Sequence, residues 1–167
     1  MRSSFCECCC ILQLWLRLPH CWTSPRRRGK PRVNPTRVAQ LAEGPIWKLL
    51  GLRIRDVSDG EAFVELPVRS DLLQIYGHVH GGLLATLLDA AMSTAVHSQL
   101  NESVTWAATT HIDVAYLRPA NGVMVSARGH VVKLGAKVAY CQADAWNDEG
   151  DIVAQGSAQF YIGYRRE

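Results

Sequence analysis

A single acidic side chain stands in an apolar segment near the middle of the chain. Between His80 and His97, Asp89 is the only charged residue, and apolar side chains would cover nearly every face of a helix there. A helix of this kind is buried, and burial disfavours a charged carboxylate unless charges or hydrogen bonds compensate. Asp89 is therefore either a structural side chain satisfied by backbone or water, or a carboxylate kept for catalysis.

The tripeptide His80-Gly81-Gly82 lies where a loop meets the start of this helix. Unpaired N–H groups at a helix start attract negative oxygen atoms, and glycine lets a ligand approach the backbone closely. Gly81 and Gly82 could thus donate hydrogen bonds to a carbonyl oxygen that gains charge during a reaction. The competing interpretation is a tight turn that needs glycine, with His80 as a helix cap.

Helix geometry separates these two features within one chain. Asp89 follows Gly82 by seven residues, about two helical turns or roughly 10 Å along the axis. A carboxylate that acts on a carbonyl must come within about 3–3.5 Å of it. If both groups are catalytic, we expect a two-fold dimer in which antiparallel helices bring each Asp89 to the other chain's glycines.

The segments around this helix have the spacing of an α+β protein. Val38–Leu50 is expected to form a helix or two half-helices closed by Gly51, and Ala62–Val68 alternates as a strand. Four more alternating segments follow the central helix, joined by short turns: Thr105–Leu117, Met124–Lys133, Lys137–Trp146 and Ile152–Gly163. This order predicts antiparallel strands wrapped on one central buried helix.

Charge and cysteine divide the chain into a leader, residues 1–37, and a body, residues 38–167. The leader holds eight of the 18 Lys and Arg residues, one acid and five of the six cysteines. We expect it to be disordered or a start site placed too far upstream, with a mitochondrial presequence as the alternative. The body is mildly acidic, which argues against a nucleic-acid partner. No segment has the roughly 20 apolar residues of a membrane span.

Three features follow one another in the body: Gln74-x-x-Gly77-x-x-His80-Gly81-Gly82, the acid Asp89 and the segment Tyr116-Leu117-Arg118-Pro119. In this order and spacing they resemble the PaaI-type hotdog acyl-CoA thioesterases of the 4HBT superfamily, and the resemblance covers about residues 38–165. It implies a hotdog fold, a curved antiparallel sheet around a central helix, assembled as a homodimer and often a homotetramer. It also implies hydrolysis of an acyl-CoA to free acid and CoA.

The resemblance assigns catalytic roles to five residues. Asp89 is expected to be the nucleophile or the general base, and the Gly82 N–H to polarise the thioester carbonyl. His80 would order the turn and the thioester, and Gln74 would position the carbonyl or a water. Thr109 would hold the water.

The Thr109 assignment has a fallback, since strand alternation places its neighbour Thr110 on the opposite face. His78, His111 and Asp113 are interpreted as surface or strand residues. Trp47, Leu83 and Leu84 are candidates to line the acyl pocket.

Coenzyme A carries phosphates, so its binding surface is expected to be basic. The candidates for CoA and substrate binding are Gly81, Arg118, Arg128, Lys133, Gly135 and Lys137, with backbone N–H groups of the 134–136 turn contributing. A solvated charged strand face explains each cation equally well. No metal and no cofactor are expected, with water as the co-substrate.

Two other functions stay open beside the thioesterase. A non-catalytic hotdog module that binds or senses acyl-CoA would not need Asp89 or Gln74. A hotdog enoyl-CoA hydratase or dehydratase would pair a histidine with an acid. The protein is expected in the cytoplasm, or in mitochondria if residues 1–37 are a presequence.

Overall fold

The computed structural model describes residues 33–101 and 104–164. All of them belong to the second of the two units into which the chain divides, Pro31–Glu167. The elements of this unit are α1 (Pro35–Ala42), α2 (Pro45–Leu50), β1 (Arg53–Ser58), β2 (Glu61–Pro67), a 3-10 turn at Ser70–Leu72, α3 (Gly81–Gln99), β3 (Val104–Tyr116), β4 (Met124–Leu134), β5 (Val138–Asn147) and β6 (Ile152–Tyr164).

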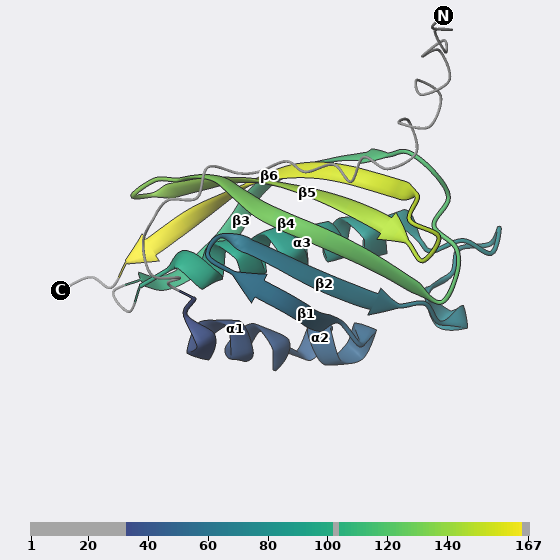
Figure 1. The fold of residues 1–167 in the computed structure, drawn as a ribbon, viewed down its shortest axis with the longest axis horizontal. Coiled ribbons are helices and arrows are strands. Elements are labelled where there is room, and N and C mark those ends of the chain that lie inside the picture. The colour runs from purple at the N-terminus through teal and green to yellow at the C-terminus, as the bar shows by residue number, and fades with distance from the viewer. Residues whose placement is uncertain (1–32, 102–103, 165–167) are drawn as a thin grey trace, which may run out of the picture. The chain divides into compact units, whose positions relative to one another are not determined.

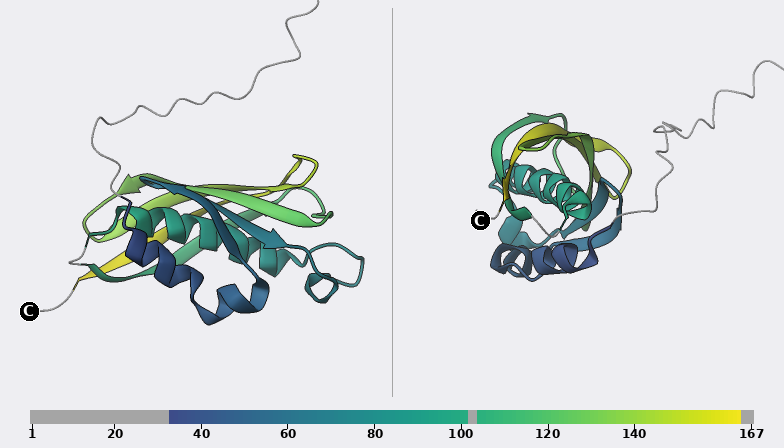
Figure 2. Two further views of the ribbon diagram at one scale, coloured as in Figure 1. Left: turned by 60° about the horizontal axis from the view of Figure 1, so that its bottom comes forward. Right: turned by 90° about the vertical axis from the view of Figure 1, so that its left-hand side faces the viewer.

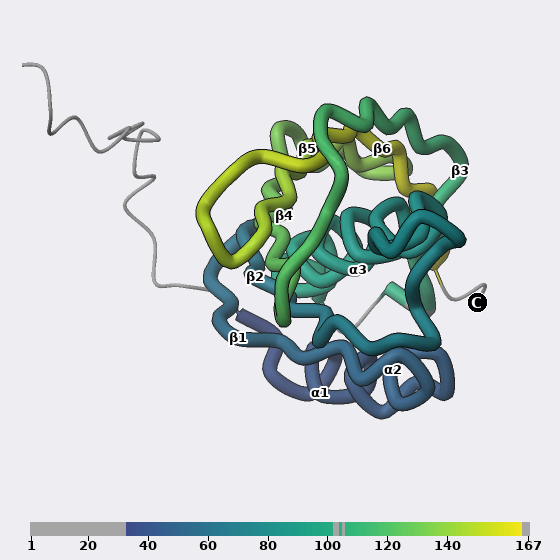
Figure 3. The backbone as a smooth tube through the Cα atoms, turned by 90° about the vertical axis from the view of Figure 1, so that its right-hand side faces the viewer, coloured from purple at the N-terminus to yellow at the C-terminus, as the bar shows by residue number. Residues whose placement is uncertain are grey.

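The six strands form one antiparallel sheet in the order β1-β2-β4-β5-β6-β3. The sheet curves around α3, which runs along its concave side (Figure 1). Among the described residues, β3 pairs only with β6, so one long edge of β3 is unpaired. The end-on views show α3 enclosed on its sheet side, with α1 and α2 along the β1 and β2 side of the unit (Figures 2 and 3).

Small residues on the inner face of the sheet let α3 approach closely. The inward positions of β5 are Ala139, Cys141, Ala143 and Ala145, all buried. On β4, a Cβ added to Gly129 would lie 2.4 Å from the backbone carbon of Ala91 in α3. The sheet therefore packs on the helix backbone here, without an intervening layer of side chains.

The predicted α+β layout is confirmed, including the two short helices before Gly51. Gly51 ends α2 with φ of 73°, a left-handed conformation that glycine adopts without strain. Strand β1 is not predicted by the sequence pattern: its positions are mostly exposed, and its register shifts between Ile54 and Asp56. An exposed edge strand with a bulge lacks the strict alternation that identifies a half-buried strand.

The predicted leader lies outside the described residues except for residues 33–37. Helix α1 begins at Pro35, three residues before the expected start of the body. Asn34 caps α1 by accepting from the Arg37 N–H at 3.2 Å, and its side-chain amide donates to the Leu100 carbonyl at 3.1 Å. The last residues of the expected leader therefore hold the C-terminal end of α3. No helix in the described ranges is long and apolar enough to cross a membrane.

Candidate active site

The start of α3 is capped by His80. The Gly82 N–H donates to Nδ1 of His80 at 3.0 Å, and the N–H groups of Leu83 and Leu84 donate to the His80 carbonyl. The expected role of His80 as a cap is therefore present. The same hydrogen bond occupies the Gly82 N–H, which is the group predicted to polarise the substrate carbonyl.

Gly81 packs against the ring of Tyr116 at the end of β3. A Cβ on Gly81 would lie 3.3 Å from the ring, so a larger residue would require the Tyr116 side chain to shift slightly. This contact joins the two halves of the family-like pattern, the His-Gly-Gly tripeptide and the Tyr116–Pro119 segment.

The loop before α3 is held by its own backbone and side chains. The Gln74 side-chain oxygen accepts from the Tyr76 N–H at 2.6 Å, and the Gln74 N–H donates to the His78 carbonyl at 2.8 Å. Gly77 has φ of 82°, a conformation that other residues adopt only with strain. These contacts leave the Gln74 amide nitrogen as the group that can still donate to a ligand.

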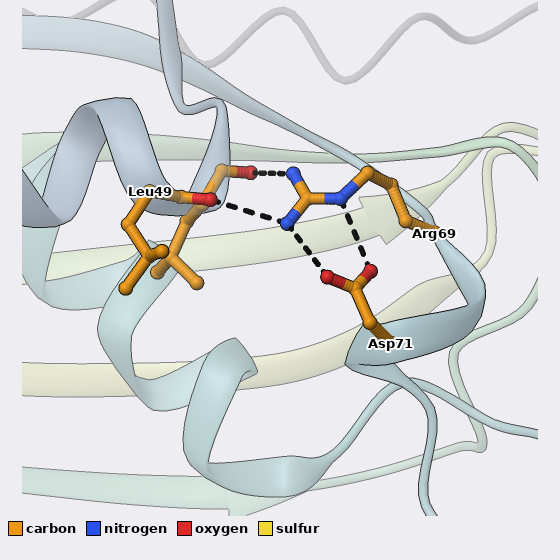
Figure 4. A network of polar contacts seen from close by, with 4 residues as sticks. Leu49, Arg69 and Asp71 are labelled. Carbon is orange, nitrogen blue, oxygen red and sulfur yellow. Dashed lines mark hydrogen bonds and ion pairs between the residues drawn. The ribbon is translucent and has the colours of Figure 1, made fainter.

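Arg69 connects this loop to α2 (Figure 4). Its guanidinium donates to the carbonyls of Leu50 and Leu49 at 2.9 and 3.1 Å, and it pairs with Asp71 at 3.1 Å. The carbonyls at the end of a helix lack intrahelical partners, so Arg69 both caps α2 and fixes the 3-10 turn that leads into the Gln74 loop.

A pocket of about 350 Å³ opens between this loop, the start of α3 and the end of β3. Its lining residues are Gln74, His78, Val79, Gly81, Leu84, Tyr116, Leu117, Arg118, Pro119 and Ala120. The wall is largely apolar, with one cation and a few polar groups, as in many small-molecule sites. Three predicted site residues, Gln74, Gly81 and Arg118, lie on it.

Asp89 lies elsewhere, beside Thr109 of β3. The Thr109 hydroxyl donates to the Asp89 carboxylate at 2.7 Å. Burial raises the pKa of Asp89, and the hydrogen bond from Thr109 partly opposes that rise. No ion pair to Asp89 occurs within the described ranges, so its charge depends on hydrogen bonds and solvent.

A bulge in β3 explains why Thr109 reaches Asp89 and Thr110 does not. The register with β6 shifts between Thr109 and His111, which makes Thr110 the extra residue. Before the bulge Ala107 packs inward with Thr109, and after it Ile112 and Val114 pack inward. Thr110 instead donates to the Gln159 carbonyl. Bulges commonly re-aim side chains next to active sites.

The basic residues predicted for CoA do not gather at one place in the subunit. Arg118 lies on the pocket and donates to the Ile152 carbonyl at 3.1 Å. Arg128 pairs with Glu61 at 2.8 Å, and its guanidinium carbon lies 5.9 Å from the centre of the Phe63 ring. It lies on the outer face of the sheet, where this partner already holds it.

Lys133, Gly135 and Lys137 belong to the β4–β5 hairpin, at the opposite end of the sheet from the pocket. Val138 pairs with Tyr161, which pairs with Ala108 in the first half of β3, whereas Arg118 follows the end of β3. The Gly135 N–H donates to the Val138 carbonyl, and Lys137 lies 4.9 Å above the Tyr164 ring. No group of metal-binding side chains occurs in residues 33–101 and 104–164.

Sequence reasoning did not identify the apolar lining of the pocket. Leu84 is a predicted lining residue, whereas Val79 and Ala120 are not. Tyr116, Leu117 and Pro119 are predicted only as parts of a motif. One signal was available: Tyr116 and Leu117 are large apolar residues at a strand end next to Arg118 and Pro119, where a core role is not expected. Both are about half exposed.

Comparisons with known proteins identify the family to which this chain is similar. The family model described as Thioesterase superfamily matches residues 76–154. A protein of Halobacterium salinarum that is named as an esterase is 37% identical over 127 residues, which cover 70% of this chain and 83% of that protein. Human acyl-coenzyme A thioesterase 13 is 27% identical over 119 residues, which cover 70% and 84%.

Solved structures show the same fold. A thioesterase family protein from Silicibacter pomeroyi has a TM-score of 0.74 at 27% identity, covering 78% of this chain and 98% of that chain. The Escherichia coli PaaI protein of the phenylacetic acid degradation operon has a TM-score of 0.68 at 23% identity, covering 77% and 96%. The predicted hotdog fold is confirmed by these likenesses, together with the curved sheet on α3.

Proposed function

The chain belongs to the thioesterase superfamily and is a thioester hydrolase, and on that premise we propose that it hydrolyses acyl-CoA to free acid and CoA. The support for CoA is that human acyl-coenzyme A thioesterase 13 and the medium/long-chain acyl-CoA thioesterase YigI of Salmonella typhimurium are similar to it. The apolar pocket with a single cation on its lining suits an acyl or pantetheine chain that leads to a phosphate-bearing group.

The observation that carries the proposal is the pair of Asp89 and Thr109. Among the residues that the structure describes, Asp89 has one side-chain donor and no cationic partner, and burial raises its pKa. Such a carboxylate is poorly placed as a structural group and well placed to accept a proton. As a base, Asp89 takes a proton from water while the oxygen attacks the thioester carbon. The C–S bond then breaks, and a proton reaches the CoA sulfur.

The second route is nucleophilic attack by Asp89 on the thioester carbon. The C–S bond breaks to release CoA, and the acyl-carboxylate anhydride is then hydrolysed by water. Thr109 holds the carboxylate in one orientation in both routes, or holds the water beside it. Both routes require an oxygen atom close to the carbonyl carbon, either an oxygen of Asp89 or that of the water beside it.

The carbonyl oxygen is stabilised at the start of α3 in this proposal. The Gly82 N–H donates to His80 Nδ1. In this proposal it donates to the substrate carbonyl oxygen as well, either in a bifurcated hydrogen bond or after the His80 ring rotates away. The neighbouring Gly81 lies on the pocket and adds a second donor at the positive end of the helix. Gln74, which also lines the pocket, contributes its side-chain amide nitrogen.

The active site forms between two subunits. Asp89 is about two helical turns from Gly82, roughly 10 Å along the axis, and it does not line the pocket of its own chain. A homodimer with a two-fold axis can place Asp89 of one subunit next to Gly82 and the pocket of the other. A homotetramer is a further prediction. An antiparallel arrangement also brings the hairpin with Lys133, Gly135 and Lys137 of one subunit toward the Arg118 end of the other, where CoA phosphates need cations.

The proposed reaction uses water and needs no metal or cofactor. The proposed compartment is the cytoplasm, with mitochondria as the alternative if residues 1–37 act as a presequence. Arg128 is not part of the proposed CoA surface, because Glu61 already neutralises it.

The test is CoA release from a panel of phenylacetyl-, benzoyl-, hexanoyl- and palmitoyl-CoA by wild type, Asp89→Asn and Asp151→Asn. Asp151 is an exposed turn residue and serves as the matched control. We expect Asp89→Asn to lose about 10²-fold or more in kcat with its fold retained, as removal of a catalytic carboxylate does, and Asp151→Asn to match wild type.

Three outcomes would contradict the proposal. Saturable binding without CoA release by wild type would indicate an acyl-CoA-binding module. A changed acyl chain still attached to CoA would indicate a hydratase. Full activity of Asp89→Asn would exclude Asp89 as base or nucleophile.

A further inference from the structure

A histidine on the pocket wall has no role in the reaction as derived so far. His78 lines the pocket and is half-buried, and its Nδ1 is hydrogen-bonded to the side-chain oxygen of Asn121. We propose that His78 donates the proton that reaches the CoA sulfur as the C–S bond breaks. The assignment rests on the proposed function and names the proton donor that this reaction requires.

Backbone contacts hold His78 and Asn121 beside each other. The Val79 N–H donates to the Ala120 carbonyl at 3.0 Å, which joins the loop before α3 to the turn after β3. The His78 carbonyl also accepts from the Gln74 N–H at 2.8 Å. The His78 ring is therefore supported from both sides, as the side chains of a catalytic site need to be.

The contact with Asn121 determines which ring nitrogen of His78 serves the substrate. An amide oxygen only accepts hydrogen bonds, so Nδ1 of His78 carries the hydrogen. Nε2 is then the nitrogen that takes up or releases a proton, and the contact with Asn121 persists in both states. A ring that is oriented through one nitrogen and exchanges protons through the other suits general acid–base catalysis.

The other ionisable side chains near the pocket are less suited to this role. The guanidinium of Arg118 does not release its proton, and a phenol such as that of Tyr116 is a much weaker acid than an imidazolium. His80 does not line the pocket, and its Nδ1 accepts from the Gly82 N–H. A proton on this Nδ1 would break the helix cap, whereas a proton on Nε2 of His78 breaks no contact.

The position of His78 fits the bond that breaks. Gly81, the proposed donor to the carbonyl oxygen, lines the same pocket as His78, and the sulfur and the carbonyl oxygen share one carbon. In both proposed routes the electron pair of the C–S bond moves to sulfur. Protonated His78 gives its Nε2 proton to the sulfur, so CoA leaves as a thiol and the ring becomes neutral. The proton that water loses returns to Nε2 through solvent, so thioester and water give free acid and thiol.

The test varies the leaving thiol while the acyl group stays the same. Hexanoyl-CoA, hexanoyl-pantetheine and hexanoyl-nitrothiophenol are compared as substrates of wild type, His78→Gln and Asp89→Asn in the full-length protein. Pantetheine carries the CoA sulfur without the nucleotide, and nitrothiophenol is an acidic thiol that leaves without a proton. His130→Gln is the matched control, because His130 is a half-buried residue of β4 that does not line the pocket.

The proposal predicts a loss that depends on the leaving thiol. His78→Gln, which cannot carry a proton, should lower kcat by roughly 10²-fold for the CoA and pantetheine thioesters, the lower end of what general acid catalysis contributes. With the nitrothiophenol ester it should match wild type. Asp89→Asn should lower kcat for all three thioesters, because attack on the carbonyl carbon is common to them. His130→Gln should match wild type throughout.

The exposed residue Asn121 gives a second variant pair that keeps the His78 ring in place. Asn121→Ala removes the acceptor for Nδ1 and should show the same dependence on the leaving thiol with a smaller loss. Asn121→Asp retains an oxygen that accepts this hydrogen bond and should restore kcat. A structural role of Asn121 alone would lower kcat for all three thioesters.

Three results would overturn the assignment of His78 and leave the proposed function intact. Equal losses on all three thioesters in His78→Gln would mean that His78 only shapes the pocket. A rise in KM for hexanoyl-CoA alone, with kcat unchanged, would mean that His78 contacts the phosphates of CoA. Full kcat for hexanoyl-CoA would remove His78 from the reaction. A wild type that releases thiol from neither CoA nor pantetheine thioesters would instead reject the proposed function, and the proton donor with it.

Discussion

The two halves of α3 differ in the partners of their buried or partly buried titratable side chains. In the second half, Thr94 and Ser98 are fully buried, and each hydroxyl donates to a carbonyl of its own helix at 2.7 Å. His97 donates to the Ser93 carbonyl at 2.8 Å, and burial lowers its pKa, which favours the neutral ring. In the first half, Thr86 also donates to a carbonyl of its own helix, that of Gly82 at 2.9 Å. Asp89 is different, because its hydrogen bond comes from Thr109 of β3.

This difference separates Asp89, the proposed reactive group, from the structural polar groups of the same helix. A buried hydroxyl or neutral imidazole that bonds to a nearby carbonyl adds little cost to the fold. A carboxylate cannot donate to a carbonyl when ionised, so Asp89 needs donors from outside the helix. Its raised pKa indicates that the single donor does not fully replace the lost hydration.

The largest expected effect is on the contact between the sheet and the middle of α3. Gly129→Ala adds a Cβ that would lie 2.4 Å from the Ala91 carbonyl carbon and 2.5 Å from the Met92 nitrogen. Because these are backbone atoms, strand and helix must separate, and we expect a loss of about 2–3 kcal/mol in the free energy of unfolding. Urea unfolding measures it; a change below experimental error would show that the sheet moves freely over α3.

A smaller effect is expected at the structural end of the helix. Ser98 accepts from the Gly60 N–H at 2.9 Å in a buried position, so Ser98→Ala leaves that N–H without its partner and should cost about 1–3 kcal/mol. Thr94→Val is the matched control, because Thr94 donates only to a carbonyl of its own helix, and it should cost less. Activity per folded molecule should stay unchanged in both variants. A lower kcat in Ser98→Ala would contradict a purely structural role for Ser98.

Sequence alone could predict most of the fold because its signals are local and periodic. The buried helix, the five strands with clear alternation and the turns at Gly51 and Gly77 follow from residue types and spacing. Strand β1 was not predicted, because apolar and polar residues do not alternate strictly in an exposed edge strand with a bulge.

For the candidate site, the sequence supports a prediction only where the residues carry a chemical signal. Asp89 is a candidate because of its isolation, and the family resemblance points to Thr109, which contacts Asp89 in the structure. The pocket wall of Val79, Leu117 and Ala120 has ordinary apolar residues, so nothing in their types indicates a ligand. The placement of Lys133 and Lys137 far from Arg118 depends on strand order, which residue spacing does not encode.

The smallest effect, and the most specific one, concerns the pH dependence of the reactive half. Asp89 must be ionised to act as base or nucleophile, so kcat falls as the pH decreases through its pKa. Burial raises this pKa and the Thr109 hydrogen bond lowers it, so Thr109→Val should raise it further. The acidic limb of the kcat profile then moves to higher pH, and kcat at a fixed mildly acidic pH falls by roughly three- to tenfold, the value of one hydrogen bond. Thr110→Val, which removes only a bond to the Gln159 carbonyl, should leave the limb in place. A limb that moves to lower pH, or moves equally in both variants, would mean that Thr109 does not stabilise the ionised form of Asp89.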